Sequence, residues 1–401
     1  MKTYKTIVLK KGKEDSLLRK HPWVFSGAIY NADDNLQEGD VVRILTANGD
    51  FIAVGHWQIG SIAVRILSFE DEQIDVEFYE KRLSVALDVR RSIGLLRNEE
   101  SDSHTVNNTF RLVHGEGDGL PGLVIDFYAD TAVMQAHSVG MHTDRMLIAQ
   151  ALKKVMKDEL LAVYYKSETT LPYKADLCQE NGFILGSSTN DIAVENGLKF
   201  HIDWLKGQKT GFFVDQRDNR SLLEQYSKER KVLNMFCYTG GFSFYAMRGG
   251  ANLVHSVDSS AKAIDLTNQN VELNFPGDAR HQAYAEDAFK YLDRMGDQYD
   301  LIILDPPAFA KHRDALRNAL RGYSKLNAKA FEKIKPGGIL FTFSCSQVVD
   351  KKDFRNAVFT AAAQSGRSVR ILHQLTQPGD HPVNIYHPEG EYLKGLVLYV
   401  E

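Results

Sequence analysis

Cysteine is scarce in this chain of 401 residues, which contains only Cys178, Cys237 and Cys345. An odd and sparse set excludes a disulfide framework and is typical of a reducing cytoplasm, where we expect the protein to be located. No two of these cysteines are close enough in sequence to form a zinc-binding pair, so we expect no metal. No apolar run is long enough to span a bilayer, and the polar N-terminus lacks the apolar stretch of a signal peptide. The sequence therefore predicts no membrane partner.

A large net charge is also absent, since the formal value is −4. Taken alone, this value argues against a nucleic-acid binder, but the distribution of charge is more informative. The first twenty residues are basic, and a second basic run follows a catalytic motif described below. Either run is compatible with a solvated surface; the position of the second favours contact with phosphates. Its basic residues are Lys311, Arg313, Arg317, Arg321, Lys325, Lys329, Lys333 and Lys335.

The chain is 43% hydrophobic and 25% charged, as expected of a globular protein, and its length predicts two or three domains. Residues 1–70 contain short runs rich in Val, Ile and Phe, separated by turn signals such as Asn48-Gly49. We expect a small β-barrel here. The aromatic and basic cluster His21–Phe25 is equally compatible with barrel core and with a surface that binds RNA. The predicted strands are Lys5–Leu9, Val41–Leu45, Phe51–Trp57 and Ser61–Leu67.

Residues 71–190 predict a linker helix and a compact α+β domain. Val85, Val89, Ile93 and Leu96 recur at helical spacing and predict the buried stripe of the linker helix. Strands, one helix and a further strand follow, an order that indicates an α+β unit. The strands are predicted at Phe110–His114, Gly122–Phe127, Thr131–Gln135 and Leu161–Lys166, and the helix at Asp144–Lys157.

From about residue 191 to residue 401, strands and helices alternate, which predicts a doubly wound parallel sheet of the α/β class. The run Leu301–Leu304 is continuously apolar, as expected of a central parallel strand. In such a sheet, ligands bind beyond the carboxyl ends of the strands. The predicted strands are Lys231–Phe236, Leu253–Asp258, Arg280–Ala285, Asp300–Leu304, Gly338–Ser344, Ser368–Gln374 and Gly395–Val400.

The ends of the first three strands carry glycine and acidic residues. Gly240 and Gly241 after the first strand let the backbone approach a ligand, but the loop matches neither the dinucleotide pattern nor a phosphate-binding Walker loop. Asp258 ends the second strand, where a carboxylate suits the two hydroxyls of a ribose. Asp287 follows the third strand and suits an adenine edge. For both aspartates the alternative is a helix cap.

The fourth strand ends in Asp305-Pro306-Pro307, and the fifth ends in Ser344-Cys345-Ser346. Two prolines stiffen the turn that holds Asp305. A lone cysteine is usually an inert core residue. Cys345, however, is at a functional strand end beside the Asp305 turn, and this position makes it a candidate nucleophile.

Taken in order, these motifs resemble class I S-adenosylmethionine-dependent methyltransferases. More closely, the chain resembles the RlmI-type bacterial 23S ribosomal RNA (cytosine-5) methyltransferases, which have an N-terminal PUA domain. The resemblance covers nearly the whole chain. It includes Glu116–Leu123, Lys209–Arg217, Asn234–Phe242, Asp305–Pro307, Phe343–Ser346, Asp380–Pro382 and Pro388–Gly395.

The resemblance implies S-adenosyl-L-methionine as cofactor and a Rossmann-like catalytic sheet. It implies that Asp258 binds the ribose, that Asp287 lies near the adenine, that Asp305 faces the target base and that Cys345 is the nucleophile. The family often has a lysine where this chain has Ala308. The implied cofactor-binding residues are Phe212, Phe213, Gln216, Arg217, Asn234, Phe236, Tyr238, Thr239, Gly240, Asp258, Asp287, Asp305 and Pro306.

The implied reaction is methylation of carbon 5 of a cytosine in 23S ribosomal RNA through a covalent cysteine adduct. Carbon 5 is a poor nucleophile until a thiolate adds to carbon 6. The alternative is methylation of an exocyclic amine of guanine or adenine, for which Asp305-Pro306-Pro307 and Phe309 are a partial match. A third reading is an RNA-binding protein with a decayed pocket. The sequence also leaves a homodimer open.

Overall fold

The structure is a computed structural model, and it describes residues 4–96, 107–172, 177 and 180–401. Cys178 lies outside the described residues. The chain divides into two compact units, and we describe each by itself. The first unit comprises residues 1–197, 202–214 and 379–390, and the second comprises 198–201, 215–378 and 391–401.

The first unit begins with a curled sheet in the strand order β2-β6-β5-β4-β1-β3. Alternate residues of its strands, such as Ile7, Leu9, Val42 and Ile44, are buried in one apolar core. The four predicted strands are confirmed, whereas β2 and β3 were not predicted, because each is short. The bounds are β1 Lys5–Leu9, β2 Trp23–Phe25, β3 Ile29–Ala32, β4 Val41–Leu45, β5 Phe51–Trp57 and β6 Ile62–Ser68, with the short helix α1 at Asp15–Leu18.

A second sheet of the first unit has the order β11-β10-β9-β8-β7 and packs with helices α2 and α4 in one core. The predicted strands and the predicted helix of this region are confirmed to within two residues. The bounds are α2 Val76–Ser92, β7 Thr109–His114, β8 Leu123–Tyr128, β9 Thr131–Ala136, α3 Val139–Thr143, α4 Arg145–Met156, β10 Ala162–Tyr165, β11 Gly182–Leu185 and β12 Ile192–Glu195.

The predicted stripe of the linker helix α2 is wrong. Val85 is 58% exposed and Ile93 is 47% exposed. The buried face instead includes Tyr79, Leu83 and Arg90. Arg90 is fully buried and forms an ion pair with Asp118, so a charged residue occupies the core side of the helix. An apolar periodicity cannot reveal such a face.

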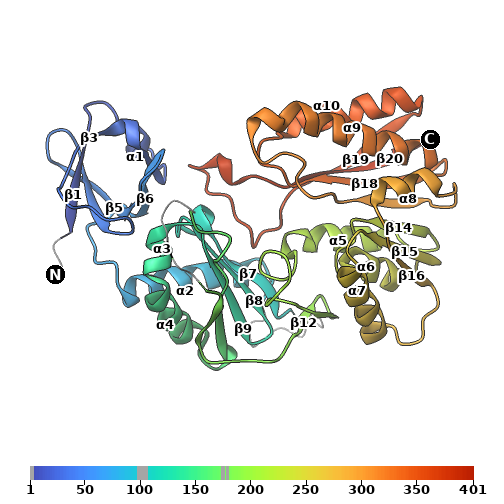
Figure 1. Ribbon diagram of the computed structural model, residues 1–401, viewed down its shortest axis with the longest axis horizontal. Coiled ribbons are helices and arrows are strands. Elements are labelled where there is room, and N and C mark those ends of the chain that lie inside the picture. Colours follow the sequence, from blue (N-terminus) through green and yellow to red (C-terminus); the bar gives the residue numbers. More distant parts are fainter. Residues whose placement is uncertain (1–3, 97–106, 173–176, 178–179) are drawn as a thin grey trace. The chain divides into compact units, whose positions relative to one another are not determined.

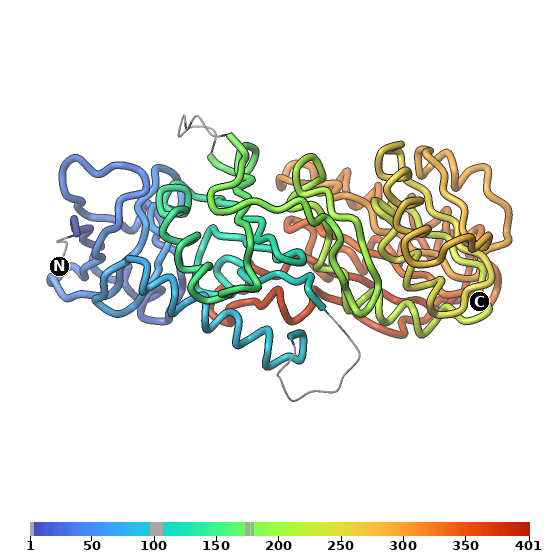
Figure 2. Tube along the Cα trace, turned by 90° about the horizontal axis from the view of Figure 1, so that it is seen from below, coloured from blue at the N-terminus to red at the C-terminus, as the bar shows by residue number. Residues whose placement is uncertain are grey.

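Residues 379–390 return from near the end of the chain to the first unit. In Figure 2 this orange-red segment runs beside the cyan and teal tube of that unit. Asp380 is fully buried: its carboxylate accepts from the main-chain N–H of Arg111, and its carbonyl accepts from Arg90 at 2.7 Å. The return segment is therefore anchored by buried polar contacts.

The sheet of the second unit has the order β16-β15-β14-β17-β18-β20-β19. Its strands are parallel from β16 to β18, and β20 pairs antiparallel with both β18 and β19. The predicted doubly wound sheet is therefore confirmed. The bounds are β14 Lys231–Met235, β15 Leu253–Asp258, β16 His281–Ala285, β17 Leu301–Leu304, β18 Gly338–Ser344, β19 Val369–Leu375 and β20 Lys394–Val400, with the separate strand β13 at Leu198–His201.

Helices cover both faces of this sheet. Figure 1 shows α8, α9 and α10 on one face and α5, α6 and α7 on the other. Helices α8 to α10 share one core with strands β14 and β17. No helix in the described part of the chain is both long enough and apolar enough to cross a membrane. The bounds are α5 Arg217–Gln225, α6 Gly241–Arg248, α7 Ala261–Asn274, α8 Ala288–Arg294, α9 Leu316–Lys333 and α10 Lys351–Ser365.

Candidate active site

The loop after β14 has an unusual backbone. Phe236 and Tyr238 adopt positive φ angles of 58° and 48°, and Gly240 has a φ of 85°. A Cβ atom at Gly240 would lie 2.6 Å from the Phe244 ring, so only glycine fits. Thr239, which lies between Tyr238 and Gly240 in the sequence, is buried. Such strain is typical of functional loops. Gly240 is also the N-cap of α6 and has no side chain that could cap the helix. The first turn of α6, with its backbone N–H groups, therefore starts directly after the loop.

Asn234 lies in β14 beneath this loop and is buried. Its Nδ2 donates to Ser243 Oγ at 2.9 Å, which continues to Ser256 Oγ at 2.6 Å. Its Oδ1 is buried without a hydrogen-bond partner among the described residues. A buried acceptor of this kind is usually satisfied by a group that the structure lacks, and a bound ligand is one such group.

Asp258 and Asp287 lie at neighbouring strand ends. Asp258 accepts from the N–H of Tyr238 at 3.0 Å and from the N–H of Ser260 at 2.9 Å, so it links the strained loop to the end of β15. Asp287 is the N-cap of α8 and accepts from the N–H of Lys290 at 3.0 Å. The cap alternative considered for Asp287 is thus present. Its role towards adenine, like that of Asp258 towards ribose, stays a prediction.

The predicted cofactor segment 212–217 is divided between the two units. In the first unit, the carbonyl of Phe212 accepts from the hydroxyl of Tyr128 at 3.3 Å, and Lys209 Nζ lies 4.8 Å from the centre of the Phe213 ring. In the second unit, Gln216 and Arg217 are buried at the start of α5. These four residues are ordered by the packing of their own units.

Asp305 and Cys345 follow adjacent parallel strands. Leu304 at the end of β17 pairs with Thr342 of β18, so the turns after both strands lie at one edge of the sheet. The hydroxyl of Tyr323, on α9, accepts from Ser344 Oγ at 2.9 Å. Burial raises the pKa of Tyr323 to about 12, and the negative charges of Cys345 and Asp305 both contribute to the rise. The two predicted catalytic residues therefore lie within electrostatic reach of one hydroxyl.

A hydrogen bond joins the turn after β18 directly to the turn after β17. Ser346 Oγ donates to the carbonyl of Ala310 at 2.5 Å, and both residues are buried. In the same turn Pro306 is buried, and the ring of Phe309 packs against that of Tyr323 with 4.6 Å between centroids. Sequence reasoning missed Tyr323, because it has no distinctive spacing from the motifs.

The two described cysteines differ in environment. Cys237 is buried in the loop after β14, and burial together with the Asp258 charge raises the pKa of its thiol. Cys345 is partly exposed. A thiol with a strongly raised pKa is unreactive. Cys237 therefore has the environment of a structural cysteine, and Cys345 is the accessible thiol of the pair.

Helix α9 carries an exposed basic stripe, which we define as Arg313, Arg317, Arg321 and Lys325. All four are exposed, and the spacing of four residues places them on one side of the helix and the turn before it. Among the described residues, none of the four forms an ion pair, whereas Lys329, one turn further, pairs with Asp293. The stripe is a concentrated positive surface.

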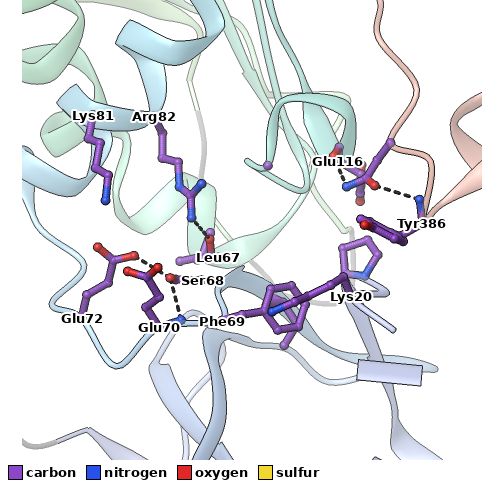
Figure 3. A pocket seen from close by; sticks show the side chains of 14 residues that line it. Lys20, Leu67, Ser68, Phe69, Glu70, Glu72, Lys81, Arg82, Glu116 and Tyr386 are labelled. Carbon is purple, nitrogen blue, oxygen red and sulfur yellow. Dashed lines mark hydrogen bonds between the residues drawn. The ribbon is translucent and has the colours of Figure 1, made fainter. Parts of the chain in front are cut away.

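A separate pocket lies in the first unit and is drawn in Figure 3. Lys20 Nζ lies 4.4 Å from the centre of the Phe69 ring, and Arg82 donates to the carbonyl of Leu67 at 3.1 Å. Tyr386, on the return segment, lines the same pocket and is 54% exposed. Three glutamates, Glu70, Glu72 and Glu116, line it as well, so basic, acidic and aromatic groups share this surface.

Comparison with known proteins agrees with these features. Residues 172–392 match the model of the S-adenosylmethionine-dependent methyltransferase family, and residues 7–69 match a PUA-like domain. The ribosomal RNA large subunit methyltransferase I of Aeromonas hydrophila is 41% identical over 98% of each chain. That of Tolumonas auensis is 40% identical, again over 98% of each chain.

Solved structures show the same fold. A protein described as a SAM-dependent methyltransferase from Streptococcus mutans is 23% identical, with a TM-score of 0.81 over 98% of this chain and 100% of that one. A methyltransferase complexed with SAH gives 0.82 at 22% identity, over the same shares of the two chains.

The sheet order and the strained loop after its first strand define a Rossmann-like methyltransferase that uses S-adenosyl-L-methionine. The chain belongs to the S-adenosylmethionine-dependent methyltransferase family, in the group that includes ribosomal RNA large subunit methyltransferase I. The resemblance drawn from the motifs, including the PUA-like domain, is thereby confirmed.

Proposed function

We propose that the protein methylates carbon 5 of a cytosine in 23S ribosomal RNA, with Cys345 as the covalent nucleophile. One observation carries the proposal: a partly exposed thiol and a carboxylate follow neighbouring parallel strands, and the charges of both act on the Tyr323 hydroxyl. The names of the full-length relatives support ribosomal RNA as the substrate.

The residues after β14 and β15 fit the cofactor. The unpaired Oδ1 of Asn234, the strained Phe236–Gly240 loop and the carboxylate of Asp258 lie at the strand ends where a doubly wound sheet binds ligands. Gln216, Arg217, Asp287 and Pro306 complete the set that we propose for the second unit. When bound, S-adenosyl-L-methionine supplies an electrophilic methyl group.

The Cys345 thiolate would add to carbon 6 of the cytosine, which makes carbon 5 nucleophilic, like the carbon of an enamine. Carbon 5 then takes the methyl group, and S-adenosylhomocysteine is the leaving product. A base removes the proton from carbon 5, the bond between sulfur and carbon 6 breaks, and the thiolate is restored. We propose that Asp305 binds the ring nitrogen 3 or the exocyclic amine during these steps.

The alternative, methylation of an exocyclic amine, requires an aromatic side chain beside the acidic turn to stack on the base. Phe309 is the aromatic residue of that turn, but its ring packs against Tyr323. Amine methylation also includes no step that requires a nucleophilic thiol at the end of β18. These observations favour the cytosine-5 reaction.

A base inside folded RNA has to leave its stack to reach such a site. We propose that the exposed basic stripe of α9 binds the phosphate backbone while this happens. Binding would then weaken as salt is raised. Salt-independent affinity would contradict this assignment.

The decisive experiment uses 23S ribosomal RNA in which cytidine is replaced by 5-fluorocytidine. Fluorine at carbon 5 cannot be removed as a proton, so the adduct should persist as a protein–RNA complex that survives denaturing electrophoresis. We expect this complex for the native protein with S-adenosyl-L-methionine and for Cys178→Ala, but not for Cys345→Ala.

Methyl transfer to ordinary RNA separates the candidates. Loss of transfer in Cys345→Ala, with cofactor binding retained by calorimetry, supports the cytosine-5 reaction. Full transfer in that variant would overturn the proposal and favour the amine reaction. Absence of cofactor binding by the native protein would favour the decayed-pocket reading.

A further inference from the structure

Lys394 is a lysine at the first position of β20, and only 6% of it is exposed. Lysine is almost never fully buried unless its ammonium group is paired. In the antiparallel pairing of β18 with β20, Lys394 is opposite Ser344, the residue before Cys345. Lys394 therefore lies against the strand end that carries the proposed nucleophile.

The turn after β18 supplies both hydrogen-bond partners of this ammonium group. Lys394 Nζ donates to the carbonyl of Ser346 at 2.5 Å and to the carbonyl of Val349 at 2.6 Å. Ser346 in turn donates its hydroxyl to Ala310, in the turn after β17. The main chain on both sides of Cys345 is thus tied to Lys394, by strand pairing before it and by a hydrogen bond after it.

Carbonyl oxygens solvate the ammonium group but do not neutralise it. Among the described residues, Lys394 forms no ion pair, and Glu391 of the same segment pairs with Lys351 at 2.7 Å. Burial lowers the pKa of Lys394 to about 8, and the negative charge of Cys345 is the first of the influences that oppose the decrease. The ammonium group and a thiolate therefore stabilise each other.

We propose that Lys394 is a positioning residue, which fixes the turn that carries Cys345 and supplies the positive charge that stabilises its thiolate. The thiolate, and not the thiol, is the attacking form, and a nearby lysine favours it. Asp305 acts in the opposite direction, because a carboxylate disfavours a second negative charge. Lys394 offsets this repulsion. The inference rests on the proposed function only in one respect, namely that the thiolate attacks carbon 6 of the cytosine.

The surrounding charges come from several elements. Tyr323 lies on α9 and is neutral at physiological pH, because its pKa is about 12. The remaining groups that act on Lys394 are Asp350, Lys351 and Glu391. All of them are retained in the variants below, so that any change in the Cys345 titration follows from Lys394.

The first test uses the native protein without cofactor or RNA. The rate of alkylation of Cys345 by iodoacetamide is measured across pH 5–10, with the modified peptide quantified by mass spectrometry. We expect an apparent pKa clearly below the value of about 8.5 for free cysteine. A value at or above that of free cysteine would overturn the proposal without any variant.

The second test changes the charge. In Lys394→Met the apparent pKa of Cys345 should rise by about one unit, so that alkylation at pH 7 becomes about tenfold slower. Lys394→Arg keeps the charge and should keep the native profile. Lys352→Met, which removes an exposed lysine of α10, is the matched control and should have no effect. A folded Lys394→Met protein with the native profile would contradict the proposal, and if this variant does not fold, the native titration decides.

The two proposals fail in different ways. If Cys345→Ala methylates RNA at the native rate, the cytosine-5 reaction is lost, but the alkylation profiles still report whether Lys394 stabilises the thiolate. If the profiles do not respond to Lys394 while Cys345→Ala is inactive, the proposed function stands and this inference is wrong.

Discussion

The hydroxyl of Ser344 donates a 2.9 Å hydrogen bond to the hydroxyl of Tyr323, and both side chains are buried. Ser344 immediately precedes Cys345 at the end of β18, whereas Tyr323 belongs to α9. The bond therefore fixes the strand end against the helix that carries the basic stripe. A local change in either residue should affect how firmly the proposed nucleophile is held.

We expect Tyr323→Phe to lower the free energy of unfolding by about 1–2 kcal/mol, because the Ser344 hydroxyl loses its acceptor in a buried site. Ser344→Ala should cost a similar amount, and the double variant should cost less than the sum. Thermal unfolding of the three proteins measures this coupling. Strict additivity would show that the bond does not contribute.

Tyr323→Phe should leave the pH dependence of methyl transfer unchanged between pH 7 and pH 9. The reason is that the pKa of Tyr323 is about 12, so that the hydroxyl is neutral throughout this range. A shifted profile would mean that Tyr323 takes part in proton transfer.

The strand ends of the catalytic sheet were predictable, because continuous apolar runs such as Leu301–Leu304 leave few alternative readings. The contribution of Tyr323 was not predictable, since it depends on how α9 is rotated against the sheet. The burial of Lys394 was not predictable for a related reason. A lysine at the start of a strand is normally exposed to solvent, whereas Lys394 is opposite Ser344 and buried in the folded sheet. The α2 stripe failed because Arg90 occupies the core side of that helix.

Asp258 and Asp287 can be separated by cofactor affinity. Asp258→Asn should weaken the binding of S-adenosylhomocysteine by about tenfold or more, because a charged acceptor for ribose hydroxyls becomes neutral. Asp287→Ala should lose about 1 kcal/mol of stability as a cap. If Asp287 also lies near the adenine, its loss weakens binding as well.

The control for Asp287 is Asp75→Ala, which removes the cap of α2 in the first unit. It should lower stability by a similar amount without changing affinity in calorimetry. Equal affinities for Asp287→Ala and the native protein would leave Asp287 as a cap alone.

Arg90 and Arg91 are neighbours in sequence with opposite environments. Arg90 and Asp118 form a buried ion pair, and Arg90 also donates to the carbonyl of Arg111 at 2.7 Å. Arg90→Leu should therefore destabilise the first unit by about 3–5 kcal/mol, because Asp118 keeps an uncompensated charge. Arg91→Leu breaks only an exposed pair with Asp88 and should cost less than about 0.5 kcal/mol. Urea unfolding of the two variants tests this difference, and similar midpoints would contradict it.

His281 should make the second unit sensitive to acid. Its Nε2 is 2.8 Å from Ser256 Oγ, and burial lowers its pKa to about 4 from an ordinary value near 6.5. Because the folded state holds this proton less tightly than the unfolded state, stability is complete above pH 6.5 and is lost as pH falls towards 4. At pH 5 we expect a loss of about 1–2 kcal/mol relative to pH 7, since His281 is only partly buried. His281→Gln should flatten this dependence in denaturant unfolding measured at both pH values, and an unchanged slope would assign the acid sensitivity to other groups.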